Sequence, residues 1–314
     1  MISIRLALAG TLAALLMFIA AAGVPPASAA SPQEVIRKAE SADEIVSYRG
    51  IKWTNIYVLG RVIRANYKVV HLNPDKTRID YFRPAELTGI ITITKGDENW
   101  RFLPKKGEWE RQRWDLDADR VELAVKNYEV KDGGTDNVAG RSVYVFKFSP
   151  RKRGSPSQSI WVDKEYFLIL RSETRNANGD LTAASAFTEI RFNSGDIKSS
   201  VFEISGREAS NSPSGKLGFR VIKPSYVPKG YQLVDVNSIN IGNDPAAHLK
   251  YSNGLNTLSI FERKGGAGPK EAQKFLKLLP RGVRMRTFNH NGIAFTIIGD
   301  IDKRELDKII KSIR

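Results

Sequence analysis

The sequence contains no cysteine among its 314 residues. Disulfide bonds, thiolate metal sites, cysteine nucleophiles and a lipid-modified N-terminal cysteine are therefore excluded. Histidine is almost as scarce, since His71, His248 and His290 are the only three. They show neither H-x-x-x-H nor H-E-x-x-H spacing, so the sequence gives no support to a zinc site. We expect all three histidines to be structural.

Motifs that carry catalytic chemistry are also missing, because the chain has no G-x-S-x-G elbow, no S-x-x-K pair and no phosphate-binding P-loop. Asp115, Asp117 and Asp119 form a D-x-D-x-D run. A calcium loop would then need Gly and Glu where the chain has Arg120 and Lys126. Paired acids of a glycoside hydrolase depend on spatial geometry and stay open. The sequence favours a binding protein without a cofactor over an enzyme.

Acidic residues are too few to balance the basic ones, which leaves a net charge of +15. From Leu217 to the C-terminus the chain has 17 Lys and Arg against 8 Asp and Glu. Such an excess fits an acidic protein segment, anionic lipid or lipopolysaccharide phosphates as a partner. The alternative is a solvated basic surface without a partner.

The N-terminus reads as a targeting segment. Arg5 precedes an apolar run over Leu6–Val24, and Ala27-Ser28-Ala29 is typical of a signal-peptidase site. We predict a signal peptide cleaved after Ala29 and a periplasmic protein. The alternative is an uncleaved membrane anchor, since the run approaches the roughly 18–20 residues that span a bilayer. Export argues against a nucleic-acid partner.

Period-two apolar alternation dominates the first part of the chain, after a helix that starts at Ser31 with Pro32 and Glu34 as its N-terminal signals. A second, short helix is predicted over Asp117–Lys126, because acidic residues in the first turn suit the helix dipole. The strands expected in this part are Ile51–Leu59, Arg61–Leu72, three within Arg78–Pro104, Glu108–Trp114, Val143–Phe148, Ser159–Asp163, Phe167–Arg175 and Ala184–Phe192.

A linker rich in Ser, Gly and Asn follows at residues 205–216. The smaller unit beyond it combines strands with two helices of period 3.6, one after Gly268-Pro269 and one after Asp302. Its strands are expected at Tyr231–Ile241, Ala246–Tyr251, Thr257–Arg263, Arg284–Phe288 and Ile293–Gly299, the last two joined through Asn291-Gly292. We therefore divide the chain into a signal (1–29), a first domain (30–204), a linker (205–216) and a C-terminal domain (217–314).

Two sets of motifs, one in each domain, resemble the MucB/RseB family. The motifs of the first domain are Arg78-Ile79-Asp80-Tyr81-Phe82-x-Pro84-x-x-Leu87-x-Gly89 and Trp100-x-Phe102-x-Pro104. Those of the second are Pro224-x-x-Val227-Pro228-x-Gly230-Tyr231 and His248-Leu249-x-Tyr251-Ser252-x-Gly254-Leu255. The chain departs from the family where members often have Leu-Pro-x-Gly-Phe, because here the stretch is Val227-Pro228-Lys229-Gly230-Tyr231.

The resemblance implies an α+β protein: a curved antiparallel sheet covered by helices, the half-barrel of the carriers LolA and LolB, and a smaller α+β domain. It implies a negative regulator of a sigma-E type envelope stress response. Such a protein binds the periplasmic part of a membrane-spanning anti-sigma factor, protects it from proteolysis and is released by lipid or lipopolysaccharide-like ligands. A homo-oligomer is compatible with this class. Two other functions remain open, a periplasmic lipid or lipoprotein carrier and an exported hydrolase.

Two groups of residues are candidates for binding. Aromatic and apolar side chains of the first domain either line a lipid cavity or fill a core; they are Trp53, Tyr57, Tyr81, Leu87, Ile91, Trp100 and Phe102. Basic side chains of the second domain are candidates for an acidic partner; they are Arg220, Lys223, Lys229, Lys250, Arg263, Arg284 and Arg286.

Overall fold

The computed structural model describes residues 31–58, 61–112, 120–193, 195–208, 217–241, 244–265 and 279–313. The predicted signal peptide, the aspartate run that begins at Asp115 and the helix expected after Gly268-Pro269 lie outside these residues. Among the described residues no helix combines the length and apolarity needed to cross a membrane.

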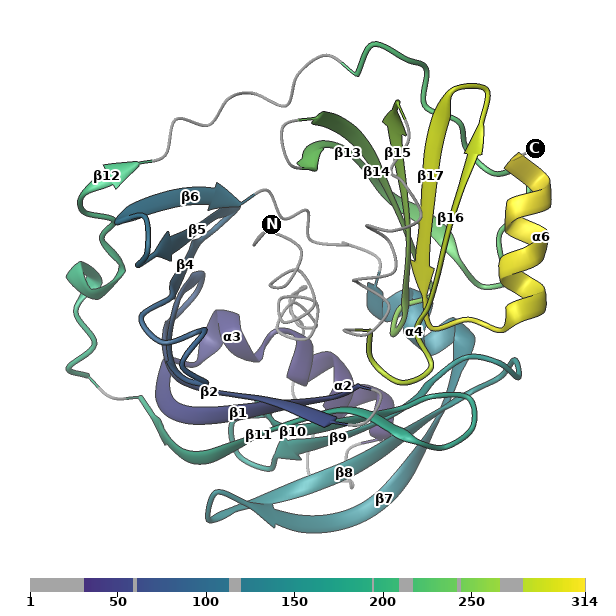
Figure 1. Ribbon diagram of the computed structural model, residues 1–314. Helices are drawn as coiled ribbons and strands as arrows, with labels where there is room; N and C mark the ends of the chain where they lie inside the picture. The colour runs from purple at the N-terminus through teal and green to yellow at the C-terminus, as the bar shows by residue number, and fades with distance from the viewer. Residues whose placement is uncertain are drawn as a thin grey trace.

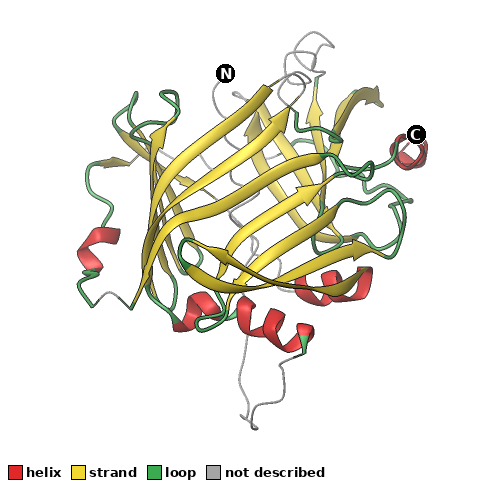
Figure 2. Ribbon diagram, turned by 90° about the horizontal axis from the view of Figure 1, so that it is seen from below, coloured by secondary structure: helices red, strands yellow, loops and turns green. Residues whose placement is uncertain are grey.

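Twelve strands form one strongly curved sheet, which occupies the lower and left parts of Figure 1. Its order is β12-β6-β5-β4-β3-β2-β1-β11-β10-β9-β8-β7, antiparallel except for the β12–β6 pair. The strands are β1 (Tyr48–Val58), β2 (Arg61–Leu72), β3 (Lys76–Arg83), β4 (Ile91–Lys95), β5 (Glu98–Leu103), β6 (Glu108–Gln112), β7 (Tyr128–Val138), β8 (Arg141–Pro150), β9 (Ser157–Asp163), β10 (Ile169–Arg175), β11 (Leu181–Phe192) and β12 (Arg207–Glu208). Seen from the convex side, the strands lie side by side across the front of Figure 2.

Two helices, α2 (Pro32–Glu40) and α3 (Ala42–Ile45), lie inside the curve of this sheet (Figure 1). Ser31 caps α2 as predicted, because its side chain accepts a hydrogen bond from the Glu34 amide at 3.3 Å. Val35, Ile36 and Ala39 of α2 pack on side chains of β7–β10. Burial of this apolar stripe is the main source of stability for so short a helix.

The convex side of the β4–β6 region is closed by the chain that follows β11. The 3₁₀ helix η1 (Ser199–Phe202) places Phe202 in an apolar cluster with Ile93 and Trp109, all buried. The Trp109 indole donates a hydrogen bond to the carbonyl of Ser205 at 3.0 Å. β12 then pairs with β6, so Arg207 and Glu208 of the predicted linker are part of the sheet.

Five further strands form the second sheet, whose order is β13-β14-β15-β17-β16. They are β13 (Gln232–Ile241), β14 (Asp244–Ser252), β15 (Thr257–Lys264), β16 (Arg284–His290) and β17 (Ile293–Gly299). Helix α6 (Lys303–Ile313) buries Leu306, Ile309 and Ile313 on one face of this sheet. The predicted α+β fold class, with a curved antiparallel sheet and a smaller second sheet, is confirmed.

Two local predictions differ from the structure. The helix expected from Asp117 is described as α4 (Arg120–Asn127), with residues 117–119 outside the described part. Strand β7 was not predicted at all. Most of its side chains are exposed and it lies at the edge of the sheet, so its sequence carries no period-two apolar pattern.

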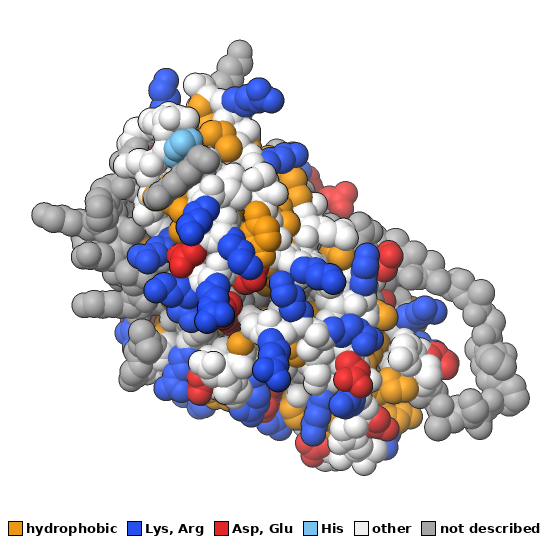
Figure 3. Space-filling view, turned by 90° about the vertical axis from the view of Figure 1, so that its right-hand side faces the viewer, with side chains coloured by type: hydrophobic (Ala, Val, Ile, Leu, Met, Phe, Trp, Pro, Cys, Tyr) orange, Lys and Arg blue, Asp and Glu red, His pale blue; other side chains and the backbone are white. Residues whose placement is uncertain are grey.

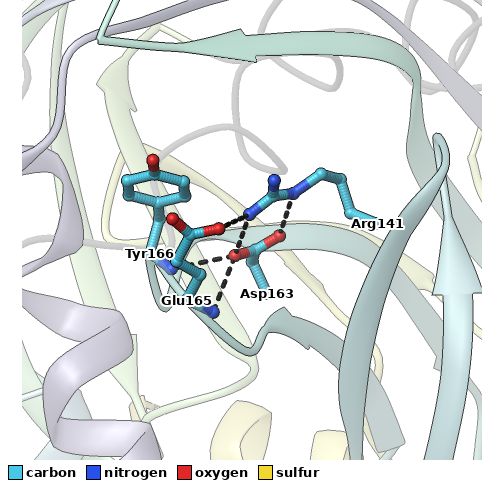
Figure 4. Close-up of polar contacts among 4 residues, drawn as sticks. All are labelled: Arg141, Asp163, Glu165 and Tyr166. Atoms are coloured by element: carbon cyan, nitrogen blue, oxygen red, sulfur yellow. Dashed lines mark hydrogen bonds and ion pairs between the residues drawn. The ribbon is translucent and has the colours of Figure 1, made fainter.

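The turn between β9 and β10 is held by the ion pairs drawn in Figure 4. Asp163, whose side chain is 0% exposed, accepts hydrogen bonds from the Arg141 guanidinium at 2.8 and 3.0 Å and from the amides of Glu165 and Tyr166. Arg141 also pairs with Glu165 at 2.8 Å. Burial raises the pKa of Asp163, but these hydrogen bonds outweigh it and hold the pKa below its usual range.

Candidate functional site

The side of the small sheet opposite α6 faces the interior of the large curved sheet (Figure 1). We call it the inner face, and it is built by the alternate residues of β14 and β15 that point away from the core. His248 pairs in register with Phe261, and Lys250 with Ser259. The His248 ring stacks on Phe261 with centroids 4.3 Å apart and an interplanar angle of 11°. Its Nε2 lies 3.0 Å from the Ser259 hydroxyl.

The inner face carries little net charge. Burial, assisted by Lys250, lowers the pKa of His248 to about 4, so this imidazole is neutral at ordinary pH. Arg263 pairs with Asp244 at 3.3 Å, and its side chain is 14% exposed. An aromatic stack with hydroxyl groups and two cations at its side suits a partner segment that mixes apolar and acidic residues.

Only two of the seven basic candidates, Lys250 and Arg263, lie on the inner face. The register places Arg284 and Arg286 on the α6 side, at the edge strand β16. The other three lie in the 217–230 segment, whose apolar residues pack on the same side as α6. These five outer cations are all exposed; they are Arg220, Lys223, Lys229, Arg284 and Arg286. The structure therefore divides the seven candidates between two faces.

The seven cavity candidates also divide between two faces, because strand pairing fixes their direction. Tyr81 pairs with Tyr67, and Leu87 packs on the same cluster, which includes Ala42 of α3 inside the curve. Asp80, the neighbour of Tyr81, pairs with Ile91, so Ile91 points to the convex side. Side chains of adjacent strand residues point to opposite faces.

Trp100 and Phe102 point the same way as Ile91 and lie under η1 in the cluster around Phe202. Trp53 is on the convex side as well, with the Arg64 guanidinium 5.9 Å from its ring. Tyr57 shares that side by its position in β1. The seven side chains do not form one lining, and ligand binding by any of them stays a prediction.

A polar cluster between α3 and the concave side of the sheet was missed from the sequence. His71 is fully buried, with Nε2 2.6 Å from the Asp43 carbonyl and Nδ1 2.8 Å from the Thr77 hydroxyl. Because a carbonyl only accepts, Nε2 carries a proton and donates it to Asp43. Lys52 lies beside this group, and burial lowers its pKa to about 8, against the effect of Asp43. A lysine at an inward position of β1 was the signal available in the sequence.

Direct contacts join the two sheets at a junction. The side-chain amide of Asn127 donates hydrogen bonds to the carbonyls of Gly230 (3.1 Å) and Asn253 (3.0 Å). The Asn253 amide in turn donates to the hydroxyl of Tyr128, which is buried. A Cβ at Gly230 would lie 2.6 Å from the Asn127 side-chain oxygen, so the close approach requires glycine there. A second contact joins the segment before β16 to β1, where the backbone amide of Arg281 donates a hydrogen bond to the Tyr57 carbonyl at 2.8 Å.

A curved sheet followed by a smaller five-stranded sheet, with helix α6 packed on it, defines a class of two-unit β-rich proteins. Residues 61–211 match the family model of the MucB/RseB N-terminal domain. This part of the chain belongs to the MucB/RseB family, as the motifs of the first domain indicated. No curated protein sequence matches it.

Solved MucB structures share this fold. A chain of the Pseudomonas aeruginosa MucA/MucB complex is similar with a TM-score of 0.65 at 16% identity, over 90% of this chain and 98% of that one. MucB in complex with MucA(peri) gives a TM-score of 0.63 at 16% identity, over 89% and 97%. A crystal structure of MucB gives a TM-score of 0.61 at 16% identity, over 92% and 98%.

Proposed function

We propose that this chain is an exported, periplasmic negative regulator of a sigma-E type stress response, a binding protein rather than an enzyme. It binds the periplasmic part of a membrane-spanning anti-sigma factor. The observation that carries the proposal is the likeness to MucB across both sheets, over 90% of this chain, because MucB has been solved with MucA(peri). The match of residues 61–211 to the MucB/RseB N-terminal domain supports it further.

The inner face is the surface that we assign to the partner. It offers the His248–Phe261 stack and the cations Lys250 and Arg263 on one side of the small sheet. The junction at Asn127 and Gly230 fixes this sheet against the large one, so a bound segment would contact both. Binding there would shield the anti-sigma factor from proteolysis.

Release by a lipid or lipopolysaccharide-like ligand requires that the ligand favour one state of the complex over the other. If the ligand-bound form holds the partner about 100-fold less tightly, the coupling free energy is about 2.7 kcal/mol. The usual range is roughly 1–3 kcal/mol, so one ligand is sufficient for such a switch.

Crosslinking in cells, followed by mass spectrometry of captured proteins and lipids, tests the proposal. We expect a single-pass membrane protein with a cytoplasmic sigma-binding segment among the captured proteins. Capture of lipid or assorted lipoproteins without such a protein would contradict the regulator and favour a lipid carrier.

A double charge reversal tests the assigned face. Lys250→Glu with Arg263→Glu should slow association with an acidic partner segment and flatten its dependence on salt, because electrostatic steering sets the association rate. The matched control is Arg220→Glu with Lys223→Glu, which changes the charge equally on the other side of the small sheet. Equal effects of the two variants would remove the inner face from the interface.

A further inference from the structure

Cations of both units meet where the β8–β9 loop reaches α6. The loop residues Arg151, Lys152 and Arg153 are all exposed. Lys152 Nζ lies 3.9 Å from a carboxylate oxygen of Glu305 in α6, and a Cβ at Gly154 would lie 3.6 Å from the Cβ of Asp302. The loop and the first turn of α6 therefore form one continuous surface.

Helix α6 presents its charged side outward, because its apolar stripe is buried on the small sheet. Lys303, Arg304, Lys308 and Lys311 are exposed. Glu305 is engaged locally, by a hydrogen bond from the Tyr226 hydroxyl and by Lys308 at 3.2 Å. Asp302 and Asp307 are the other acidic residues of this stretch, and neither forms an ion pair with a described cation of the helix.

The same side carries the five outer cations of the 217–230 segment and of β16. Figure 3 faces α6 and shows Lys and Arg side chains spread across this side, in excess over the acidic ones. Within the described residues, Arg151, Arg153, Lys303, Arg304 and Lys311 are in no ion pair. We call this side the outer basic surface; its cations come from the β8–β9 loop, the 217–230 segment, β16 and α6.

We propose that the outer basic surface docks on a bilayer of anionic phospholipid headgroups, a partner distinct from the segment bound at the inner face. The inference goes beyond the proposed function and shares only its periplasmic location. The cations come from four separate segments and are spread over a whole side, whereas an acidic peptide engages charges along one line. A charged headgroup plane contacts all of them at once, and long side chains adapt to it with little rearrangement.

The test is cosedimentation of the processed protein, purified from periplasmic extract, with vesicles of phosphatidylglycerol and phosphatidylcholine. Binding should require phosphatidylglycerol and fall steeply with salt, since these exposed charges are screened. Each cation near an anionic surface contributes roughly fivefold to the partition coefficient. The triple variant Arg151→Gln, Arg153→Gln, Lys303→Gln should therefore bind about 100-fold more weakly.

The matched control removes the same charge from exposed positions of β2 and β3 and of the turn between β5 and β6, through Lys68→Gln, Arg83→Gln and Lys105→Gln. It should bind vesicles nearly as the unmodified protein does. Equal losses in both variants would mean a non-specific effect of net charge and would overturn the proposal. Polyglutamate serves as a model acidic peptide. If the triple variant bound vesicles normally but lost binding to polyglutamate, the surface would be a peptide site and the proposal would be overturned.

Partner capture by the two variants, measured in parallel, separates this proposal from the regulatory function. Capture retained while vesicle binding is lost supports two independent surfaces. Loss of both partner capture and vesicle binding in the triple variant, but not in the control, would place the partner on the outer basic surface and contradict two separate surfaces. Absence of the anti-sigma partner with lipid binding intact would contradict the regulatory function only.

Discussion

Buried carboxylates occur at two places in the first part of the chain, and their hydrogen bonds are complete at one place and incomplete at the other. At the end of β9, both oxygens of Asp163 accept hydrogen bonds, from Arg141 and from two backbone amides. Inside the curve, Glu40 is 6% exposed, and one carboxylate oxygen each of Glu40 and Asp43 has no hydrogen-bond partner among the described residues. Asp163 therefore holds its turn in place, whereas Glu40 and Asp43 are buried with incomplete hydrogen bonding.

Their pKa values move in opposite directions for that reason. Hydrogen bonds hold the pKa of Asp163 below its usual range despite burial. Burial raises the pKa of Glu40 to about 7, with Arg37 opposing the shift, and raises that of Asp43. Hydrogen bonds to a buried carboxylate stabilise its charged form, whereas a buried carboxylate that lacks them favours its protonated form.

The largest change in the free energy of unfolding is expected at Asp163, whose hydrogen bonds are complete. Asp163→Ala leaves Arg141 without its main partner and should lower the free energy of unfolding by roughly 3–5 kcal/mol in urea denaturation at pH 7. Because the folded pKa is depressed, this contribution is present above about pH 4 and is lost as the pH falls through the folded pKa. The control Glu165→Gln removes an exposed partner of Arg141 and should lower the free energy of unfolding much less than Asp163→Ala does. Equal costs would contradict the role of burial.

The buried carboxyl group of Glu40 should change stability with pH in the opposite sense. The pKa of Glu40 is about 4.5 in the unfolded chain and about 7 when folded, so its contribution to stability decreases as the pH rises between these values. Glu40→Gln should therefore stabilise the protein by on the order of 2–3 kcal/mol at pH 8, with little change at pH 4.5. The measurement is urea denaturation of both proteins at each pH. A variant less stable than the parent at pH 8 would show that the carboxylate has a partner.

The junction between the sheets is held by hydrogen bonds between neutral groups. Asn127→Ala removes both hydrogen bonds to the Gly230 and Asn253 carbonyls and should cost roughly 1–3 kcal/mol. If the junction couples the two units, separate thermal transitions should also become visible by calorimetry. The exposed Asn178→Ala serves as a control and should change neither quantity. One unaltered transition in Asn127→Ala would assign the coupling to the contact at Arg281.

Local chemistry made much of the fold predictable. Strand β2 has the predicted bounds, Arg61–Leu72, because its apolar residues alternate without a break. The hairpin at Asn291-Gly292 forms because both residues adopt a positive φ, 49° and 74°, which this pair tolerates. Strand β7 escaped prediction because Asp132-Gly133-Gly134 resembles a turn and only the pairing with β8 makes it a strand.

The candidate sites were harder to predict, because the segments that cover one face of each sheet lie far away in the sequence. Alternation shows that Ile91 and Tyr81 lie on opposite faces, but nothing local shows that η1, about 100 residues later, covers one of them. Similarly, Lys250 and Arg220 look alike in sequence. Only the packing of α6 and the 217–230 segment on one side of the small sheet separates them.

The smallest effect is expected where a charge pair is close but solvated. Lys106 Nζ lies 2.9 Å from Glu110, nearly as close as Arg141 to Asp163, and the hydrogen bond with Glu110 raises the pKa of Lys106. The Lys106 side chain is nevertheless 57% exposed. Water already solvates both charges, so Lys106→Ala should change the free energy of unfolding by less than about 0.5 kcal/mol, and 1 M salt should abolish even that. A cost near that of Asp163→Ala would mean that distance, not burial, decides the strength of these pairs.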